Sequence, residues 1–449
     1  MHGDFSRVTF DAGQHYSSVR VQQGRAYLDA EANEQAAILV HSIRSATRDL
    51  IGQHGVPSTA PTVDGFLVEA PPAATAAADG LSIRAGVYYV DGIRCENAAP
   101  STYFAQPDFF PDSRTEPLPT GTARYLVYLD VWERHVTHLD RALLREVALG
   151  GPDGASRTQI VWQVKVLEAL QKADGTTLAD ADVTPVEIAR IVQGRLAAAR
   201  PMLRARVKPG DVSTTPCVMP PSGGYRGREN QLYRIEVHEG GDARTATVKW
   251  SRDNGSVVFP ITAFTANTVT VAHLGLDRTR SIVEGDWVEV LDDVAILHGR
   301  HGALARVQAA PDSRLIELAN VGGASPTADL SLARHPFLRR WDHRAGAASG
   351  AMPIIESTDP AKNWIDLEDG IQVQFQPGVP DQRYVTGDYW TIAARTATNA
   401  IEWPTDGALP AWLPPTGIEH HYAPLVMMAG ATPGRRYRKV VQMTVLDQQ

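Results

Sequence analysis

Two pairs of histidines share the spacing His-x-x-His, at His135 and His138 and at His298 and His301. Imidazoles that converge with a carboxylate can bind zinc. The first pair follows a predicted strand, where residues three apart point to opposite faces. The second pair spans Gly299 in a predicted loop, and the sequence has no His-Glu-x-x-His motif. We therefore expect neither pair to bind a metal, and we assign no cofactor to the chain.

Acidic residues occur in several groups, and a glycosidase needs two carboxyl groups at a fixed separation. Trp364 lies near Asp366 and Glu368, and Trp390 follows Asp388. The two tryptophans are therefore candidates for a platform that binds a cell-surface glycan. The alternative is that both rings are buried, which is common in small β domains. An open aromatic groove beside two carboxyl groups would favour the carbohydrate interpretation.

Motifs of other reaction classes are absent from the sequence. We find no Gly-x-Ser-x-Gly nucleophile motif, no phosphate-binding loop and no dinucleotide fingerprint. Neither Cys95 nor Cys217 has a convincing catalytic partner. The basic run Arg435–Lys439 lies in a chain of net charge −8, where such a run more often forms a contact surface than a nucleic-acid site. We expect no catalytic residues, no enzymatic activity and no nucleic-acid partner.

Composition indicates a folded protein. Of the 449 residues, 43% are hydrophobic and 21% are charged, which is typical of globular domains. No apolar run reaches the length of a membrane span, and the first residues do not form a secretory signal. The 37 glycines and 30 prolines separate short apolar segments, a pattern typical of strands joined by turns.

We predict a mainly β protein with an N-terminal helix, an α+β chain containing several small antiparallel barrels or sandwiches. The predicted domains are an N-terminal docking segment at 1–55, a β-rich domain at 56–205, a small barrel or sandwich at 206–335 and a C-terminal β domain at 336–449. Within the second domain, Thr184 and Pro185 predict the start of a helix near 185–200.

Two local patterns predict strands. Asp91-Gly92 lies between apolar stretches, as in a tight hairpin whose two central residues need positive φ. Residues 371–376 alternate apolar side chains with glutamines, which predicts a strand with one buried face and one wet face that carries Gln372, Gln374 and Gln376.

The clearest amphipathic pattern lies near the start of the chain. A helix is predicted over 29–51, with Asp29 as its N-cap and Gly52 as its end. One stripe has the alternating spacing of a heptad seam, and it consists of Ala32, Ala36, Leu39, Ile43, Ala46 and Leu50. Either the stripe packs on its own domain, or it makes a short coiled-coil-like contact between subunits.

Several longer motifs support a resemblance that covers most of the chain: Gly3–Arg7, Val21–Arg25, Tyr125–Arg134, Arg145–Asp153, Lys249–Ser256 and Gly387–Trp390. The chain resembles a family of uncharacterised domains encoded with phage-tail-like contractile injection systems. A looser likeness joins the piece around Gly24-Arg25 and Asn33-Glu34 to the N-terminal regions of phage tail-fibre and baseplate-attached proteins, which are commonly trimers.

The resemblance implies a structural particle component, associated with the baseplate or attaching a fibre or spike. It implies a homo-oligomer, with a trimer favoured, that meets other baseplate or tail proteins and is assembled in the cytoplasm before any release from the cell. The expected interface consists of Gly24, Arg25, Asn33, Ala36, Leu39, Ile43, Ala46 and Leu50. A carbohydrate-binding or carbohydrate-active tail protein and a delivered effector are the alternatives.

Overall fold

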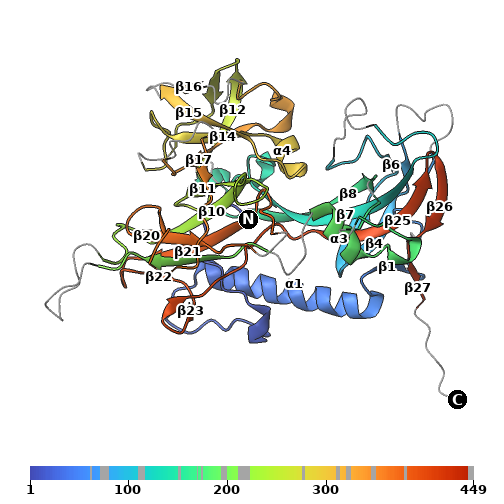
Figure 1. Ribbon diagram of the computed structural model, residues 1–449, viewed down its shortest axis with the longest axis horizontal. Helices are drawn as coiled ribbons and strands as arrows, with labels where there is room; N and C mark the ends of the chain where they lie inside the picture. The colour runs from blue at the N-terminus through green and yellow to red at the C-terminus, as the bar shows by residue number, and fades with distance from the viewer. Residues whose placement is uncertain are drawn as a thin grey trace. The chain divides into compact units, whose positions relative to one another are not determined.

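The computed structural model describes residues 1–60, 63–70, 80–109, 117–149, 153–168, 170–172, 175–193, 200–210, 223–275, 279–309, 314–319, 325–344, 350–359, 361–378 and 382–442. The protein is mainly β, with an N-terminal helix, several antiparallel sheets and one six-stranded barrel (Figure 1). This confirms the predicted fold class. None of the helices in the described ranges is long and apolar enough to cross a membrane.

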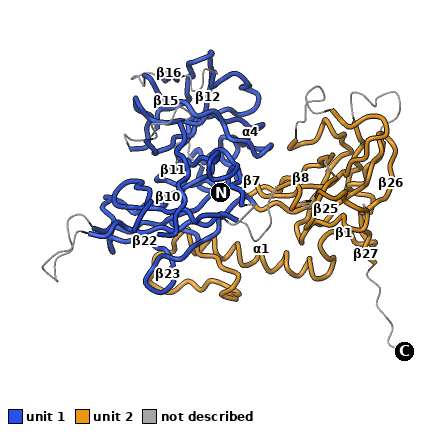
Figure 2. Tube along the Cα trace, viewed as in Figure 1, with its two compact units in different colours: residues 1–8, 135–157, 195–418 blue, residues 9–134, 158–194, 419–449 orange. Residues whose placement is uncertain are grey.

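The chain forms two compact units, each assembled from separated stretches (Figure 2). Unit 1 contains residues 1–8, 135–157 and 195–418, and unit 2 contains residues 9–134, 158–194 and 419–449. The domain boundaries predicted near 55, 205 and 335 divide the chain in sequence order. The two compact units combine separated stretches of sequence, because strands far apart in sequence pair with one another.

The described strands of unit 2 form three sheets. The largest has the order β26-β25-β7-β8, with β7 at Arg124–Val136, β8 at Arg157–Leu167, β25 at His421–Ala429 and β26 at Thr432–Arg436. Eight consecutive residues of β7 are buried, as expected of a strand covered on both faces. The second sheet consists of β27 (Val440–Val441), β1 (His54–Pro57), β4 (Gly86–Val90) and β5 (Ile93–Asn97), and the third of β2 (Val68–Glu69), β3 (Ser82–Ile83) and β6 (Ser101–Thr102).

The predicted hairpin and second helix both lie in unit 2. Val90 pairs with Ile93, and Asp91 and Gly92 have φ of 48° and 81°, which confirms the hairpin. Helix α3 spans Pro185–Gln193, and the Thr184 hydroxyl accepts a hydrogen bond from the Glu187 amide at 3.2 Å. The predicted end of this helix near 200 cannot be compared, because residues 194–199 lie outside the described ranges.

Two sheets of unit 1 pack around one core. The five-stranded sheet has the order β18-β11-β10-β21-β22, with β10 at Gln231–Glu239, β11 at Thr247–Ser251, β18 at Met352–Pro353, β21 at Tyr389–Arg395 and β22 at Ala400–Glu402. The other sheet consists of β19 (Ile365–Asp366), β20 (Ile371–Phe375) and β9 (Leu203–Val207). Tyr233, Trp250, Phe375 and Trp390 belong to the core between them.

A closed antiparallel barrel is inserted into the five-stranded sheet between β11 and β18. Its strands follow the order β12-β13-β16-β15-β14-β17, with β12 at Val258–Phe264, β13 at Thr268–Val271, β14 at Trp287–Leu291, β15 at Ala303–Ala309, β16 at Leu315–Ala319 and β17 at Phe337–Trp341. The short helix α4 spans Asp293–Leu297. The remaining elements are β23 (Thr405–Asp406), β24 (Leu409–Pro410) and the 3₁₀ turns Ala12–Gln14, Ala142–Leu144, Val147–Leu149, Asp180–Asp182 and Leu332–Arg334.

The predicted wet face of β20 is wrong. Gln372 and Gln374 are buried, and each side-chain oxygen accepts a hydrogen bond from an arginine of β9. Arg204 Nε donates to Gln374 at 2.8 Å, and Arg206 Nε donates to Gln372 at 2.9 Å. The ring of Trp364 covers the Arg206 guanidinium at 3.8 Å from its centre. The polar side chains of this face are therefore buried together with hydrogen-bond partners.

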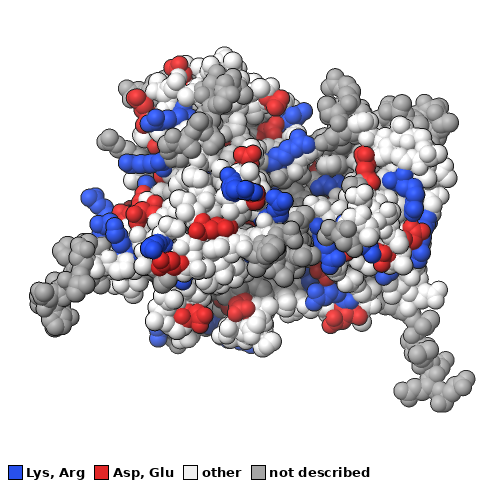
Figure 3. Space-filling model, viewed as in Figure 1, with Lys and Arg blue, Asp and Glu red and all other residues white. Residues whose placement is uncertain are grey.

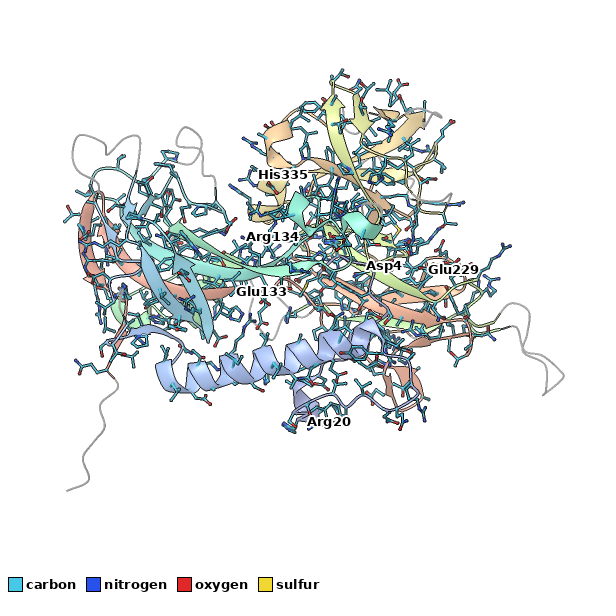
Figure 4. The ribbon with its side chains drawn as sticks, turned by 180° about the vertical axis from the view of Figure 1, so that it is seen from behind. Asp4, Arg20, Glu133, Arg134, Glu229 and His335 are labelled. Atoms are coloured by element: carbon cyan, nitrogen blue, oxygen red, sulfur yellow. The ribbon has the colours of Figure 1, made fainter. Side chains whose placement is uncertain are left out.

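Helix α1, Asp29–Ile51, is anchored to the sheets of unit 2. Arg44 donates to Glu133 of β7 at 2.5 Å, and Arg48 donates to Asp91 of the hairpin turn at 3.3 Å. Figure 4 labels Glu133 on the side of β7 that faces α1. The turn passes so close to the helix that a Cβ atom added to Gly92 would lie 2.1 Å from the Arg44 carbonyl oxygen.

We predict that Gly92→Ala destabilises the protein by about 3 kcal/mol, from left-handed strain and the clash with the helix backbone. Gly121→Ala is a matched control, because Gly121 also has positive φ but its Cβ would meet no atom within 4 Å. The control should lose only about 1 kcal/mol. Urea unfolding measures both changes, and equal losses would contradict the close approach of the turn to α1.

Candidate docking surface

Helix α1 has the predicted bounds but a different cap. Its N-cap is Leu28, whose amide donates to the Glu31 carboxylate at 2.7 Å. The prediction that Asp29 is the N-cap is wrong, because Asp29 already lies in the first turn, where its charge still suits the helix dipole. Gly52 ends the helix with φ of 87°, and its amide donates to the Arg48 carbonyl at 2.7 Å.

The two faces of α1 differ in burial. Ala30 and Ile38 are buried on one face of the helix. The predicted seam lies on the other face, and Leu39, Ile43 and Leu50 are 53%, 65% and 69% exposed. The seam alanines Ala36 and Ala46 are exposed, and Ala32 is half-buried. Within a single chain this stripe is therefore not covered by its own domain.

The residues that flank the seam are almost uncharged. Counting heptad positions from the seam, they are Asn33, Val40 and Thr47 on one side and Gln35, Ser42 and Asp49 on the other. A contact between identical helices places these flanks against the flanks of another copy. Charges of one sign there would repel each other, and only Asp49 contributes a charge. The surface is thus compatible with a second copy of the same chain.

The segment of residues 9–28, called the arm, precedes the helix. Gly24 has φ of 71°, and the Arg25 amide donates to the Gln22 carbonyl at 3.3 Å, so a turn forms there. Arg25 and Asn33 are both exposed.

Side-chain hydrogen bonds tie the arm to α1. The Thr9 hydroxyl donates to Glu34 at 2.6 Å, and the Val19 amide donates to Gln35 at 2.8 Å. The side chains of Tyr16, Val21 and Tyr27 are more than half exposed. Further apolar surface therefore lies on the same segment as the exposed seam.

The candidate glycan residues have different environments. Trp390 is 2% exposed, and its indole N–H donates to the Leu413 carbonyl at 3.0 Å. Trp364 is half-buried beneath Arg206. Trp390 has no exposed face that a sugar could stack on, so Trp364 is the one ring of the pair that remains a candidate.

One histidine of each His-x-x-His pair contacts a side chain from elsewhere in the sequence. His138 Nδ1 lies 3.1 Å from Asp153, and the ring of His301 lies 4.3 Å from that of His238. Across the described part of the chain, no group of three or more His, Cys, Asp or Glu residues is arranged to hold a metal ion. Cys95 is buried, and Cys217 lies outside the described residues.

Unit 1 contains a buried ionic cluster that the sequence analysis missed. Lys249 of β11 and Glu289 of β14 are each 1% exposed, and Lys249 Nζ lies 2.7 Å from both carboxylate oxygens. Glu236 of β10, the cross-strand partner of Lys249, lies 3.3 Å from the same Nζ. It also accepts from Arg234 at 2.6 Å and contacts His2 at 2.9 Å.

The cations of this cluster control its protonation. Burial alone would raise the pKa of Glu236, but Arg234 and Lys249 together hold it well below its usual range. Burial, and after it the charge of Lys249, lower the pKa of His238 to about 3. The sequence did contain a signal for this cluster. Charged residues alternate along two neighbouring strands, and Arg234, Glu236 and His238 occupy one face of β10.

On the face displayed in Figure 3, basic and acidic side chains are interspersed, so neither sign dominates that face.

Comparison with known proteins gives one match. The model of a family of unknown function, DUF6519, matches residues 1–183 and 167–440. The chain belongs to this family. No curated protein and no solved structure matches it. Membership in DUF6519 supports the resemblance to an uncharacterised family and assigns no activity.

We predict that acid destabilises the fold through its buried histidines. Burial lowers the pKa of His343 and of His54 from 6.5 to about 4. The unfolded chain therefore binds protons that the folded chain does not, and stability falls as the pH drops from about 6.5 to about 4. Each such histidine contributes about 1.4 kcal/mol per pH unit.

The measurement is urea unfolding between pH 7 and pH 4.5, for the wild type and for His343→Gln and His54→Gln. Each variant should show a shallower loss of stability over this range, whatever its stability at pH 7. Slopes equal to that of the wild type would show that these histidines are not held neutral.

Proposed function

We propose that this protein is a non-enzymatic structural component of a phage-tail-like contractile injection particle. It is associated with the baseplate or attaches a fibre or spike, and it acts by docking as a homo-oligomer. The single observation that carries the proposal is the heptad seam of α1, which remains exposed in the isolated chain.

The seam has a physical reason to be covered. Burying a Leu or Ile side chain contributes about 1.5–3 kcal/mol, and three such residues line the stripe. Exposed apolar stripes of this kind mark interaction sites on folded proteins. Because the spacing is that of a heptad and the flanks are nearly uncharged, the partner that fits is the same helix of another copy.

The resemblance to tail-fibre and baseplate-attached proteins favours three copies around the seam. Closed symmetry would bury all the seams together, and the alanines at Ala32, Ala36 and Ala46 would let the helices approach closely. The remaining surfaces of the oligomer would then be available for other baseplate or tail proteins.

The placement is tested on purified particles from cells with and without the gene. The protein should be present in wild-type particles, and its loss should leave particles with altered structure or attachment. Wild-type particles that are intact but lack the protein would contradict the proposal. Finding the protein inside the tube would favour a delivered effector instead.

We predict that Leu39→Asp or Ile43→Asp weakens self-association by roughly 100-fold or more. An unpaired carboxylate in the seam costs several kcal/mol to bury, and each 1.4 kcal/mol corresponds to a tenfold change. Light scattering measures the mass of the native species, and circular dichroism shows whether the variant is folded.

Leu143→Asp is the control, because Leu143 is 98% exposed and lies outside α1. It should assemble like the wild type. A folded Leu39→Asp or Ile43→Asp protein with the wild-type mass would exclude the seam as the interface.

A further inference from the structure

The buried cluster of unit 1 holds the groups needed for an intramolecular condensation. Lys249 Nζ lies 2.7 Å from each oxygen of Glu289, so the amine nitrogen and the carboxyl carbon are already in contact range. Both side chains are withdrawn from water. Two groups held in this way behave as if present at very high concentration, which favours bond formation between them.

Both oxygens of Glu289 already have N–H partners. The Gly302 amide donates to Oε1 at 2.9 Å, and the Trp341 indole donates to Oε2 at 2.9 Å. Such donors stabilise negative charge that develops on a carboxyl oxygen under nucleophilic attack. The ring of Trp341 also covers Lys249 Nζ, 4.5 Å from the ring centre, which excludes water from that side.

Two further groups are placed to move protons. Glu236 Oε1 lies 3.3 Å from Lys249 Nζ, and His238 Nδ1 lies 3.4 Å from it. A neighbouring carboxylate or imidazole within hydrogen-bond reach of the nucleophile can carry a proton from it to the leaving group.

We propose that Lys249 and Glu289 form an intramolecular amide bond during maturation of the protein. One proton passes from Nζ to Glu289, and the resulting amine attacks the carboxyl carbon. A second proton moves from nitrogen, through Glu236 or His238, to the Glu289 oxygen that took the first proton, and that oxygen leaves as water. The C–N bond replaces one C–O bond, no oxidant or external proton is needed, and one ammonium and one carboxylate become a neutral amide.

The bond would join the inserted barrel to its parent sheet. Lys249 lies on β11 of the five-stranded sheet, and Glu289 lies on β14 of the barrel. Removing two opposite charges from a dry interior also removes their desolvation cost. This inference does not rest on the proposed function.

The test is the mass of the intact, denatured full-length chain. The wild type should be lighter than its sequence by one water molecule, and digestion should give a branched peptide that joins the Lys249 segment to the Glu289 segment. Lys249→Arg should show the full sequence mass. Glu236→Gln should slow the appearance of the lighter form in freshly made protein.

A second lysine–carboxylate pair provides an internal control. Lys165 Nζ lies 2.7 Å from Asp130 in unit 2, but its side chain is 22% exposed and contacts one carboxylate oxygen. The same digest should show Lys165 and Asp130 unlinked. Wild-type protein that keeps its full sequence mass after prolonged incubation would establish Lys249 and Glu289 as an ion pair only and would overturn the inference.

Discussion

A lysine ammonium that is withdrawn from water must be matched by negative charge at short range, and this requirement organises unit 1. Until the proposed amide bond forms, Lys249 satisfies it with Glu289 from the barrel and Glu236 from the neighbouring strand. Glu236 in turn requires Arg234 and His2. Removing one member would leave another charge unmatched, so the barrel and the sheet are coupled through electrostatics as well as through the chain connections at β11 and β18.

In unit 2, the two faces of helix α1 have different environments. Helix α1 contacts its own sheets through Arg44 and Arg48, and its seam of leucine, isoleucine and alanine is exposed to solvent. A helix that served only the core would place its large apolar residues inward. One face therefore holds the helix in the fold, and the other face is the one that would contact the partner that we propose.

Local patterns in the sequence predicted local structure well. The bounds of α1 and the hairpin at Asp91-Gly92 follow from spacing and turn chemistry. Local patterns did not predict the burial of the glutamines of β20. Their burial depends on Arg204 and Arg206, which belong to a strand more than 160 positions away in the sequence. The ionic cluster was missed for the same reason. A charged strand face is ordinarily wet, and only the fold shows that the barrel covers this one.

The pairing of β25 with β7 has a consequence for how the chain is made. The Tyr125 hydroxyl donates to the Gly430 carbonyl across 305 positions. The largest sheet of unit 2 can therefore be completed only after residues near 430 have left the ribosome. At about 5–20 residues per second, that wait lasts roughly 15 to 60 s. During this time the edge of β7 lacks its native neighbour and is open to wrong pairings, whereas the barrel, formed from one contiguous stretch, can close early. Synthesis therefore favours completion of the barrel before the sheet of unit 2, and conditions that stall translation late in the chain expose β7 for longest.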